Sequence, residues 1–399
     1  MHAQSELMLD EEQPREPATR PAPRRQIRVL MAAGGTGGHI FPALAVADEL
    51  RRRSESAGPR PVCYETVFLG TGRGLELHII PRAGYRLEKV YAAGLKGISG
   101  RKRLLNAARL PRSAFETARL LYRLRPGVVV GIGGYVSGPV MVESALAGIP
   151  TLLYEPNVVP GFTNRVLAPV VRLAAVGFEQ SLATYGSKGR VTGHPVRQEF
   201  YRVAPKLHKP PYTVLIVGGS QGARALNQCM MESLPLFRSK AEPPSFIHQT
   251  GEADYNAVEA AYGDHWAGSY VCAFIDNIAG AFSRADLVVC RAGAATVAEL
   301  AAAGKASILV PYPSATDQHQ LHNAMALEHA GAACVIEQKD LDPVRLVDCV
   351  MSLLGDPGKL ARMEQRAKTL ANPQAASRIA DLIEELCRKP QAGGTKSGS

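Results

Sequence analysis

Paired cysteines, aromatic residues and long apolar runs are all scarce in this sequence. Seven cysteines are scattered over 399 residues without a Cys-x-x-Cys pair, which argues against a disulfide scaffold or a zinc site and favours a reduced, cytoplasmic setting. Aromatic residues make up only 6% of the chain and form no recognised stacking motif, so we expect no nucleic-acid partner. No apolar run approaches the roughly 20 residues that a membrane-spanning helix needs.

Two common nucleotide-binding fingerprints are also missing. Dinucleotide-binding domains need Gly-x-Gly-x-x-Gly, but Ile40 and Ser220 stand where the two glycine-rich loops should carry a further glycine. The second predicted strand ends in Gly70-Thr71 instead of the acidic residue that would bind a ribose. No Gly-x-x-x-x-Gly-Lys-Ser/Thr loop is present. These absences argue against an NAD-dependent oxidoreductase and against a P-loop NTPase.

Patterns of metal ligands are missing as well. The histidines show no His-Glu-x-x-His or comparable spacing. Asp340 and Asp342 have the spacing of a diphosphate–metal motif, but Pro343 and a helical run follow, so we expect Asp342 to cap a helix. We therefore expect no required metal ion and no tightly bound cofactor.

What the sequence does contain is a regular alternation of apolar strands and helical segments. Helical patterns fill most of the intervals between strands, which predicts parallel sheets covered by helices on both faces and hence an α/β fold. The predicted strands are Arg28–Ala32, Thr66–Leu69, Val128–Gly131, Thr151–Tyr154, Leu173–Val176, Thr213–Val217, Phe246–Gln249, Tyr270–Ala273, Leu287–Cys290 and Ser307–Val310.

One strand–loop–helix unit occurs twice. VLMAAGGTGGH at 29–39 recurs in form as VLIVGGSQGARALN at 214–227, and the proline-containing HKPPYT just before is typical of a linker. We therefore predict two similar doubly wound domains with a ligand in the cleft between them, at the carboxyl ends of the strands. Composition predicts disorder at residues 1–26 and 389–399.

The glycine-rich loops of both copies, and a third at 131–139, favour a diphosphate ligand because they offer successive backbone N–H groups and helix N-termini. The alternative is that these glycines only permit tight turns. Thr296 and Glu299 have the spacing of a capping box, so Glu299 either caps a helix or accepts two ribose hydroxyls. The polar segment 311–324 suits sugar hydroxyls, although a solvated helix start would also be polar.

Basic residues are concentrated in one segment. The formal net charge of +10 calls for an anionic partner. Residues 94–126 hold nine lysines and arginines against the single acidic Glu116, with apolar residues at near-helical spacing among them. This pattern indicates a helix that lies on an anionic membrane; the alternative is a packed helix with a solvated outer face.

Five motifs in the chain carry a family resemblance. They are GGTGGHIFPALAVADEL, GIGGYVSGPV, GGSQGARALN, CRAGAATVAEL and TDQHQLHNA. Their order and spacing over about residues 27–388 resemble the MurG family of peptidoglycan glycosyltransferases, in glycosyltransferase family 28. The resemblance implies the GT-B fold, with an acceptor- and membrane-facing Rossmann-like domain at 27–195, a linker at 196–212, a UDP-N-acetylglucosamine-binding Rossmann-like domain at 213–371 and a helix at 372–388 that packs back on the first domain.

The resemblance also implies an activity. This is the inverting, metal-independent transfer of N-acetylglucosamine from UDP-N-acetylglucosamine to the C4 hydroxyl of undecaprenyl-diphosphate-N-acetylmuramoyl-pentapeptide (lipid I), which gives lipid II. It implies a peripheral protein at the cytoplasmic face of the bacterial plasma membrane, with the anionic surface bound through residues 94–126, and cell-wall synthesis or division proteins as further partners. Two alternatives remain: a related GT-B enzyme with another lipid acceptor, and a catalytically silent UDP-sugar-binding protein.

The resemblance assigns roles to single residues. His39 matches the proposed base for the acceptor hydroxyl, and Glu155 is the competing base. The other implied positions are Thr36, Gly37 and Gly38 in the first loop; Asn157, Arg197 and Ser220 at the donor; Ile275 at the uracil through its backbone; Ala294, Ala295, Thr296, Val297, Ala298 and Glu299 around the diphosphate and ribose; Gln320 at the transferred sugar; and Tyr135, Asn164 and Asn227 elsewhere in the cleft.

Two short segments depart from the family pattern. The chain has YEPN at 154–157 where the family commonly has His-Glu-Gln-Asn, and GHPVR at 193–197 where it commonly has Gly-Asn-Pro-Val-Arg. Glu155, Asn157 and Arg197 are kept, so we expect the departures to alter local hydrogen bonding more than activity. Pro156 in particular removes a backbone N–H.

Overall fold

The computed structural model describes most of the chain. The segment expected to be disordered at the carboxyl end and most of the one at the amino end lie outside the described residues, as do residues 94–113 of the basic segment. Strand β1 begins at Arg25, so the predicted extension 1–26 is two residues too long. The described residues are 25–34, 37–55, 62–90, 114–133, 136–219, 222–263, 266, 268–313 and 318–388.

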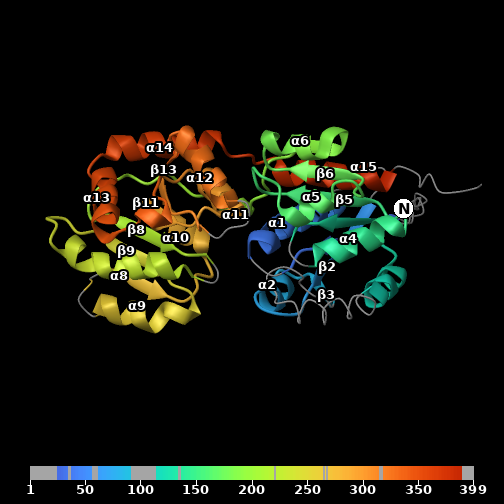
Figure 1. Ribbon diagram of the computed structural model, residues 1–399, viewed down its shortest axis with the longest axis horizontal. Coiled ribbons are helices and arrows are strands. Elements are labelled where there is room, and N and C mark those ends of the chain that lie inside the picture. Colours follow the sequence, from blue (N-terminus) through green and yellow to red (C-terminus); the bar gives the residue numbers. More distant parts are fainter. Residues whose placement is uncertain are drawn as a thin grey trace, which may run out of the picture.

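The first domain is built on a parallel sheet of seven strands in the order β3-β2-β1-β4-β5-β6-β7. Alternate side chains of a strand point to opposite faces: in β1, Val29 and Met31 enter one apolar cluster, and Leu30 and Ala32 enter another. Both faces are therefore buried under helices (Figure 1). The strands are β1 (Arg25–Ala32), β2 (Val62–Gly70), β3 (Arg86–Lys89), β4 (Val128–Gly131), β5 (Thr151–Glu155), β6 (Leu173–Val176) and β7 (Gly189–Val191).

The helices that cover this sheet bury one apolar stripe each. In the first of them, Ile40, Leu44, Ala47 and Leu50 recur at helical spacing and enter the cluster on one face of the sheet. The helices are α1 (Gly37–Glu55), α2 (Glu76–Arg82), a helix over residues 114–124, α4 (Ser137–Leu146), α5 (Phe162–Leu167) and α6 (Leu182–Tyr185), with 3-10 turns η1 (Glu179–Ser181) and η2 (Gly186–Lys188).

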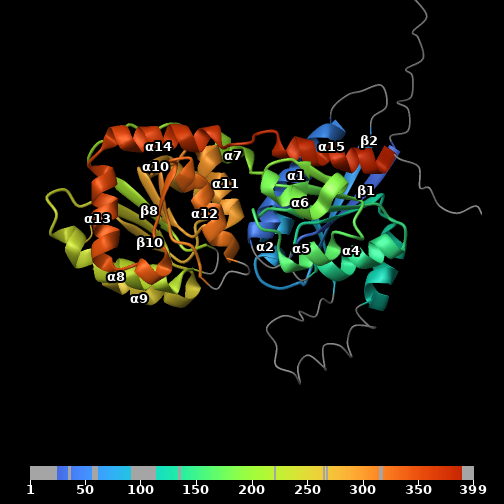
Figure 2. The same cartoon turned by 45° about the horizontal axis from the view of Figure 1, so that its top comes forward.

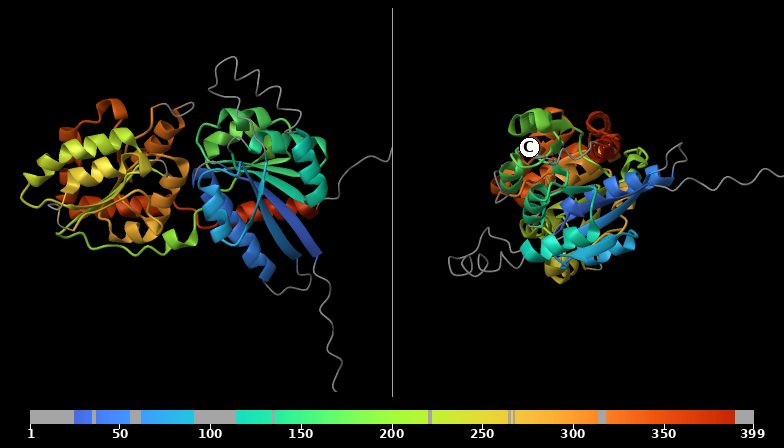
Figure 3. Two further views of the ribbon diagram at one scale, coloured as in Figure 1. Left: turned by 90° about the horizontal axis from the view of Figure 1, so that it is seen from below. Right: turned by 90° about the vertical axis from the view of Figure 1, so that its right-hand side faces the viewer.

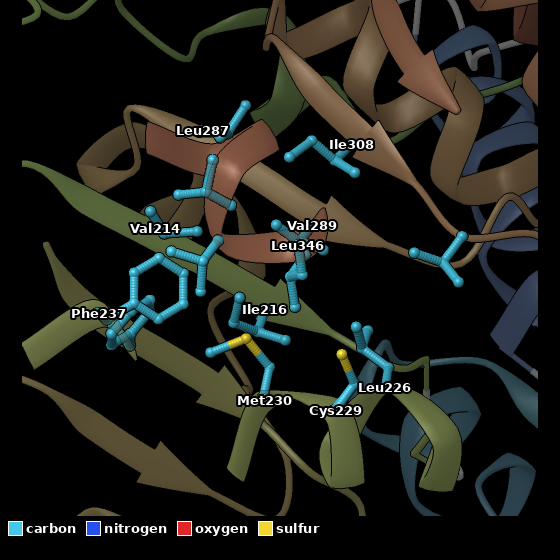
Figure 4. Packing of buried hydrophobic residues seen from close by; sticks show 14 of the residues in the cluster. Val214, Ile216, Leu226, Cys229, Met230, Phe237, Leu287, Val289, Ile308 and Leu346 are labelled. Carbon is cyan, nitrogen blue, oxygen red and sulfur yellow. The ribbon is translucent and has the colours of Figure 1, made fainter. Parts of the chain in front are cut away.

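The second domain repeats this plan with six parallel strands in the order β10-β9-β8-β11-β12-β13. Figure 4 shows the cluster on one of its faces, where Val214 and Ile216 of the central strand meet Leu226 and Met230 of a covering helix. The strands are β8 (Thr213–Val217), β9 (Ser245–Gln249), β10 (Tyr270–Cys272), β11 (Leu287–Cys290), β12 (Ser307–Leu309) and β13 (Ala333–Val335).

The helices of the second domain include the one predicted to start at Asp342. The Asp342 side chain accepts a hydrogen bond from the Arg345 N–H, and Pro343 lies in the first turn, so the predicted cap is confirmed. The elements are α8 (Arg224–Arg238), α9 (Tyr255–Tyr262), α10 (Ile278–Arg284), α11 (Ala294–Ala303), α12 (His319–His329), α13 (Pro343–Leu354) and α14 (Pro357–Thr369), with 3-10 turns η3 (Glu252–Asp254) and η6 (Gln338–Asp340).

The chain crosses between the domains twice. The first crossing follows β7 and contains the short helix α7 (Gln198–Tyr201). The second runs from α14 to α15 (Ala375–Arg388), which lies along the first domain (Figure 2). Ile379 and Ile383 of α15 enter the same apolar cluster as α1, and Glu384 pairs with Arg53 of α1 at 2.9 Å. The two domains lie side by side, and the last helix of the chain packs on the first of them (Figure 3).

All ten predicted strands are present, although their ends shift; β2, for example, begins at Val62 instead of Thr66. Three strands that the sequence did not predict, β3, β7 and β13, lie at outer edges of the two sheets. Their own sequences are short, at three or four residues, and β3 (RLEK) and β7 (GRV) contain charged residues. Pairing with a neighbouring strand, more than their own apolar content, makes them strands. In the described part of the chain, no helix is long and apolar enough to span a bilayer.

Candidate active site

A cavity of about 1580 Å³ lies between the two domains. Its walls are loops that follow the carboxyl ends of β1 and β5 in the first domain and of β8, β9, β10 and β11 in the second. Parallel strands bring such loops together at one edge of each sheet, and the two edges face one another here. The cleft predicted from the sequence is therefore present, and polar groups from both domains meet in it.

His39 enters the cavity from the first turn of α1, between two glycine-rich loops. Its ring lies against Gly133: a β-carbon added there, at a backbone φ of 105°, would be 2.8 Å from His39 Cδ2. Burial lowers the pKa of His39, a backbone hydrogen bond with Gly34 opposes this, and nearby His319 lowers the pKa further. The imidazole is therefore neutral near pH 7 and able to accept a proton. Gly37 and Gly38 also line the cavity.

Glu155, the second candidate base, ends β5 with both carboxylate oxygens occupied. Oε1 accepts from the backbone N–H and the side-chain amide of Asn157 at 2.9 and 3.1 Å. Oε2 accepts from the N–H of Gly161 at 3.0 Å and from Asn164 Nδ2 at 2.8 Å. Burial raises the pKa of Glu155, and these four hydrogen bonds to the ionised form oppose the rise. An ionised carboxylate has about four acceptor positions, so the geometry favours a role in holding the loop at 156–161.

Arg197 links the two walls of the cavity. Its guanidinium lies over the Phe41 ring of α1, 4.2 Å from the centroid, and over Phe200 at 5.0 Å. On the other side, its Nη2 is 3.4 Å from Oε1 of Glu299 in α11, and its Nη1 is 2.9 Å from Glu199. Phe41 was not among the residues singled out from the sequence, and its aromatic side chain in a glycine-rich segment is the signal that could have identified it.

Glu299 and the first turn of α11 form the wall opposite His39. Burial raises the pKa of Glu299 to about 7, against the lowering effect of Arg197. Glu299 makes its ion pair with Arg197, and the N-cap residue Gly293 has no side-chain cap, so the capping-box alternative for Thr296 and Glu299 is wrong. Ala294, Ala295 and Thr296 line the cavity, where the helix N-terminus favours negative charge.

Val297 and Ala298 do not line the cavity. Val297 is only 3% exposed and packs in the apolar cluster of the second domain, and Ala298 packs against the same cluster. A helix turns by about 100° per residue, so only part of the predicted run 294–299 can face the ligand. Both residues pack α11 against the apolar core of the second domain.

The backbone N–H of Ile275, the residue predicted to contact the uracil, is hydrogen-bonded within the protein. The N–H of Ile275 donates to Gln249 Oε1 at 3.1 Å, and Gln249 Nε2 donates to the carbonyl of Gly219 at 3.0 Å. Gln249 therefore ties two loops of the cavity wall together. The sequence reasoning missed it, although its place at the carboxyl end of β9 is a usable signal.

Polar residues of α12 complete the second wall. Gln320 lines the cavity, and its Oε1 accepts from the Tyr312 N–H at 3.0 Å. Asn323 is fully buried and contacts the first domain, where its Nδ2 is 3.4 Å from Asn157 Oδ1. Asn157 therefore contacts both its own loop and the second domain.

Asn227 does not belong to the cleft. It is 1% exposed, its Nδ2 donates to Thr250 O and Asp254 at 2.9 and 2.8 Å, and its Oδ1 lies 3.1 Å from His248 Nε2. This expectation is corrected, because α8 turns the side chain into the domain interior. Asn164 does line the cavity, but its amide is bonded to Glu155. Thr36, Tyr135 and Ser220 lie outside the described residues.

Among the residues that the structure describes, no group of three histidine, cysteine, aspartate or glutamate side chains is arranged to hold a metal ion. The cationic groups that face the cavity are Arg197 and Arg291 from the core of the site and Arg82 and Arg224 nearer its margin. Together with the N-terminus of α11, these cationic groups would suit a phosphorylated ligand.

Two Rossmann-like domains that face one another across a nucleotide-sized cleft define the GT-B class of glycosyltransferases. The family model for the glycosyltransferase family 28 N-terminal domain matches residues 29–176, and that for the C-terminal domain matches residues 213–383. This chain belongs to glycosyltransferase family 28.

Two proteins similar to this chain carry the same name. The chain is 43% identical over 364 residues to the UDP-N-acetylglucosamine–N-acetylmuramyl-(pentapeptide) pyrophosphoryl-undecaprenol N-acetylglucosamine transferase of Myxococcus xanthus, which covers 90% of this chain and 93% of that protein. A protein of the same name from Solibacter usitatus is 41% identical, with 90% and 96% covered. The crystal structure of Acinetobacter baumannii MurG superposes with a TM-score of 0.69 at 33% identity and covers 90% of this chain and 99% of that one.

Proposed function

We propose that this chain transfers N-acetylglucosamine from UDP-N-acetylglucosamine to the C4 hydroxyl of the N-acetylmuramoyl unit of lipid I, which gives lipid II. The name that the similar proteins share, and their similarity to this chain over almost its whole length, support this activity. The observation that carries the proposal is the convergence of His39 from the first domain and Glu299 with the N-terminus of α11 from the second on one cavity.

The second domain holds the donor in this proposal. The N–H groups at the start of α11, which begins at Ala294, bind the diphosphate, and Glu299 accepts hydrogen bonds from the ribose hydroxyls. When the sugar–phosphate bond breaks, its electron pair goes to the UDP oxygen. The helix dipole and Arg197 stabilise that charge, so we propose that the reaction needs no metal ion.

The first domain supplies the base. The acceptor oxygen forms its bond to the anomeric carbon from the face opposite UDP, so the configuration inverts. The acceptor proton passes to His39, at the ring nitrogen that is not bonded to Gly34, and the buried ring is neutral and ready to receive it. Glu155 keeps the loop at 156–161 in place beside this step.

We also propose that the first domain binds the cytoplasmic face of the plasma membrane. The described end of the basic segment, the helix at 114–124, exposes Phe115 (70%) and Tyr122 (76%) next to Arg119 and Arg123. Apolar side chains of α4 and α5 are exposed in the same domain, with Leu146 at 84%. Apolar and basic groups together are what an anionic lipid surface attracts.

The test is transfer of labelled N-acetylglucosamine from its UDP donor to a lipid I analogue in the presence of EDTA. Product is expected, and a panel of other lipid acceptors is expected to give none. Donor binding without product would remove the acceptor assignment. Product that disappears with EDTA would remove the metal-independent mechanism.

Membrane binding is tested separately. Reversal of Arg119 and Arg123 to glutamate is expected to weaken binding to anionic vesicles while transfer to a short-chain acceptor stays unchanged. Unchanged vesicle binding would contradict the membrane proposal.

A further inference from the structure

Tyr154 and His194 are two buried polar residues that contact one another between the acceptor side of the cleft and the first crossing. Tyr154 lies next to the end of β5, and His194 lies where the chain leaves β7 for the second domain. Tyr154 Oη is 2.6 Å from His194 Nδ1, and the ring centroids are 5.7 Å apart. Both residues are buried, with exposed fractions of 1% and 9%.

The protonation of this pair follows from its burial. Burial lowers the pKa of His194 to about 3 and raises the pKa of the Tyr154 phenol well above its ordinary value, so both groups are neutral. With the phenol as donor to Nδ1, the one atom of the pair left without a partner is His194 Nε2. The opposite direction would leave the phenol hydrogen unbonded as well. Tyr154 therefore donates and His194 accepts.

Tyr154 is tied to the acceptor side of the cleft. The next residue is Glu155, whose carboxylate holds the loop at 156–161. The carbonyl of Tyr154 also accepts from Asn164 Nδ2 at 3.2 Å, and Asn164 lines the cavity. The backbone of Tyr154 therefore joins its side chain to this loop.

His194 is tied to both crossings between the domains. The neighbouring Gly193 has a φ of 79°, and a β-carbon there would clash with Asn372 Nδ2. Asn372, on the second crossing, donates through Nδ2 to the Thr192 carbonyl at 3.2 Å. Three residues beyond His194 comes Arg197, which contacts Glu299 in the second domain.

We propose that the Tyr154–His194 hydrogen bond is a positioning contact, which sets the Glu155 loop of the acceptor side relative to the crossing that carries Arg197. This inference rests on the proposed transfer reaction, since it concerns the alignment of the two substrates. In the proposed reaction, the groups that bind the diphosphate and ribose of the donor lie in the second domain, whereas Arg197 acts on the charge that develops as the sugar–phosphate bond breaks. Loss of the bond is therefore expected to slow the transfer step and to leave donor affinity nearly unchanged.

The chain contains a matched control for the substitution. Tyr262 Oη lies 3.2 Å from His248 Nδ1, and both residues are buried inside the second domain away from the cavity lining. Each of the substitutions Tyr154→Phe and Tyr262→Phe removes a tyrosine hydroxyl that lies next to a buried histidine Nδ1. A conservative rescue also exists, because the Oδ1 of asparagine occupies the place of histidine Nδ1. His194→Asn keeps an acceptor for Tyr154, and His194→Leu removes it.

The experiment measures transfer kinetics, UDP affinity by calorimetry and backbone hydrogen exchange on the four variants. Tyr154→Phe and His194→Leu are expected to lower kcat about tenfold with the UDP dissociation constant within about twofold. Exchange is expected to become about tenfold faster both in residues 156–164 and in residues 192–197. His194→Asn and Tyr262→Phe are expected to match the wild type in kcat, in the UDP dissociation constant and in the exchange rates of residues 156–164 and 192–197.

Equal loss of kcat in Tyr154→Phe and Tyr262→Phe would overturn the proposal, because general destabilisation would then explain both. So would faster exchange confined to one of the two segments. If the wild type transfers no sugar to lipid I, the proposed function fails, and the exchange measurement still decides whether the bond couples the loop to the crossing. If Tyr154→Phe does not accumulate as folded protein, the comparison of His194→Leu with His194→Asn gives the same decision.

Discussion

A buried group of charges around His208 anchors the crossing segment to the second domain. His208 Nδ1 lies 3.0 Å from Asp286 Oδ1, and Nε2 lies 3.2 Å from Glu364 Oε2, with only 4% of the histidine side chain exposed. Lys305 Nζ is 3.4 Å from the other oxygen of Glu364. The hydrogen bond to Asp286 and the carboxylate of Glu364 raise the pKa of His208 to about 9.

This shift predicts how stability depends on pH. The ordinary pKa of 6.5 applies to the unfolded chain, so the folded state binds the proton more tightly by about 2.5 pKa units. At roughly 1.4 kcal/mol per unit, protonated His208 contributes about 3 kcal/mol to the free energy of unfolding. Because the folded pKa is the higher one, this contribution is complete below pH 6.5 and is lost as the pH rises through 9.

The assay is urea unfolding of the wild type and His208→Gln at pH 6 and pH 9.5. Fluorescence of Trp266, the single tryptophan, reports on the second domain, where it packs against Phe246 at 5.5 Å between ring centroids. Burial lowers the pKa of Lys305, which is present in both proteins, so the wild type and the variant are compared with each other at each pH. The stability gap between the two proteins is expected to shrink by about 3 kcal/mol at the higher pH. A gap that stays constant with pH would refute the reasoning.

Three further predictions concern residues that the sequence assigned to the cleft. Because burial lowers the pKa of His39 and the neutral ring is the base, the acidic limb of kcat/KM is expected below pH 6.5, and His39→Ala should lower kcat by about 100-fold; near-wild-type turnover at saturating substrates would sink the assignment. Glu299→Gln is expected to weaken UDP binding by about tenfold and to weaken binding of a diphosphate without ribose much less, as calorimetry would show. Asn227→Ala should lower the free energy of unfolding by about 1–3 kcal/mol through its buried hydrogen bonds, with kcat unchanged; a selective loss of kcat would return Asn227 to the site.

Local sequence determined most of the architecture. Apolar runs such as Val128–Gly131 are strands because both of their faces are buried, and the glycine-rich turns after them start helices wherever they occur. The Asp342 cap followed from three neighbouring residues alone. The prediction of an anionic ligand rests on the same kind of local signal, because glycine-rich turns before helices at the carboxyl ends of parallel strands suit anions.

Tertiary structure decided which of the polar side chains are free to act. The donors to Glu155 lie within nine residues of it, yet only the folded loop shows that they fill both of its oxygens. Nothing near Asn227 in the sequence shows that its helix turns it inward. Tyr154 and His194 are 40 positions apart, and their contact exists only because β5 and the exit from β7 are brought together by the order of the sheet. A sequence specifies local conformation through each residue's own backbone and nearest neighbours, whereas side-chain partners over long separations depend on how whole elements pack.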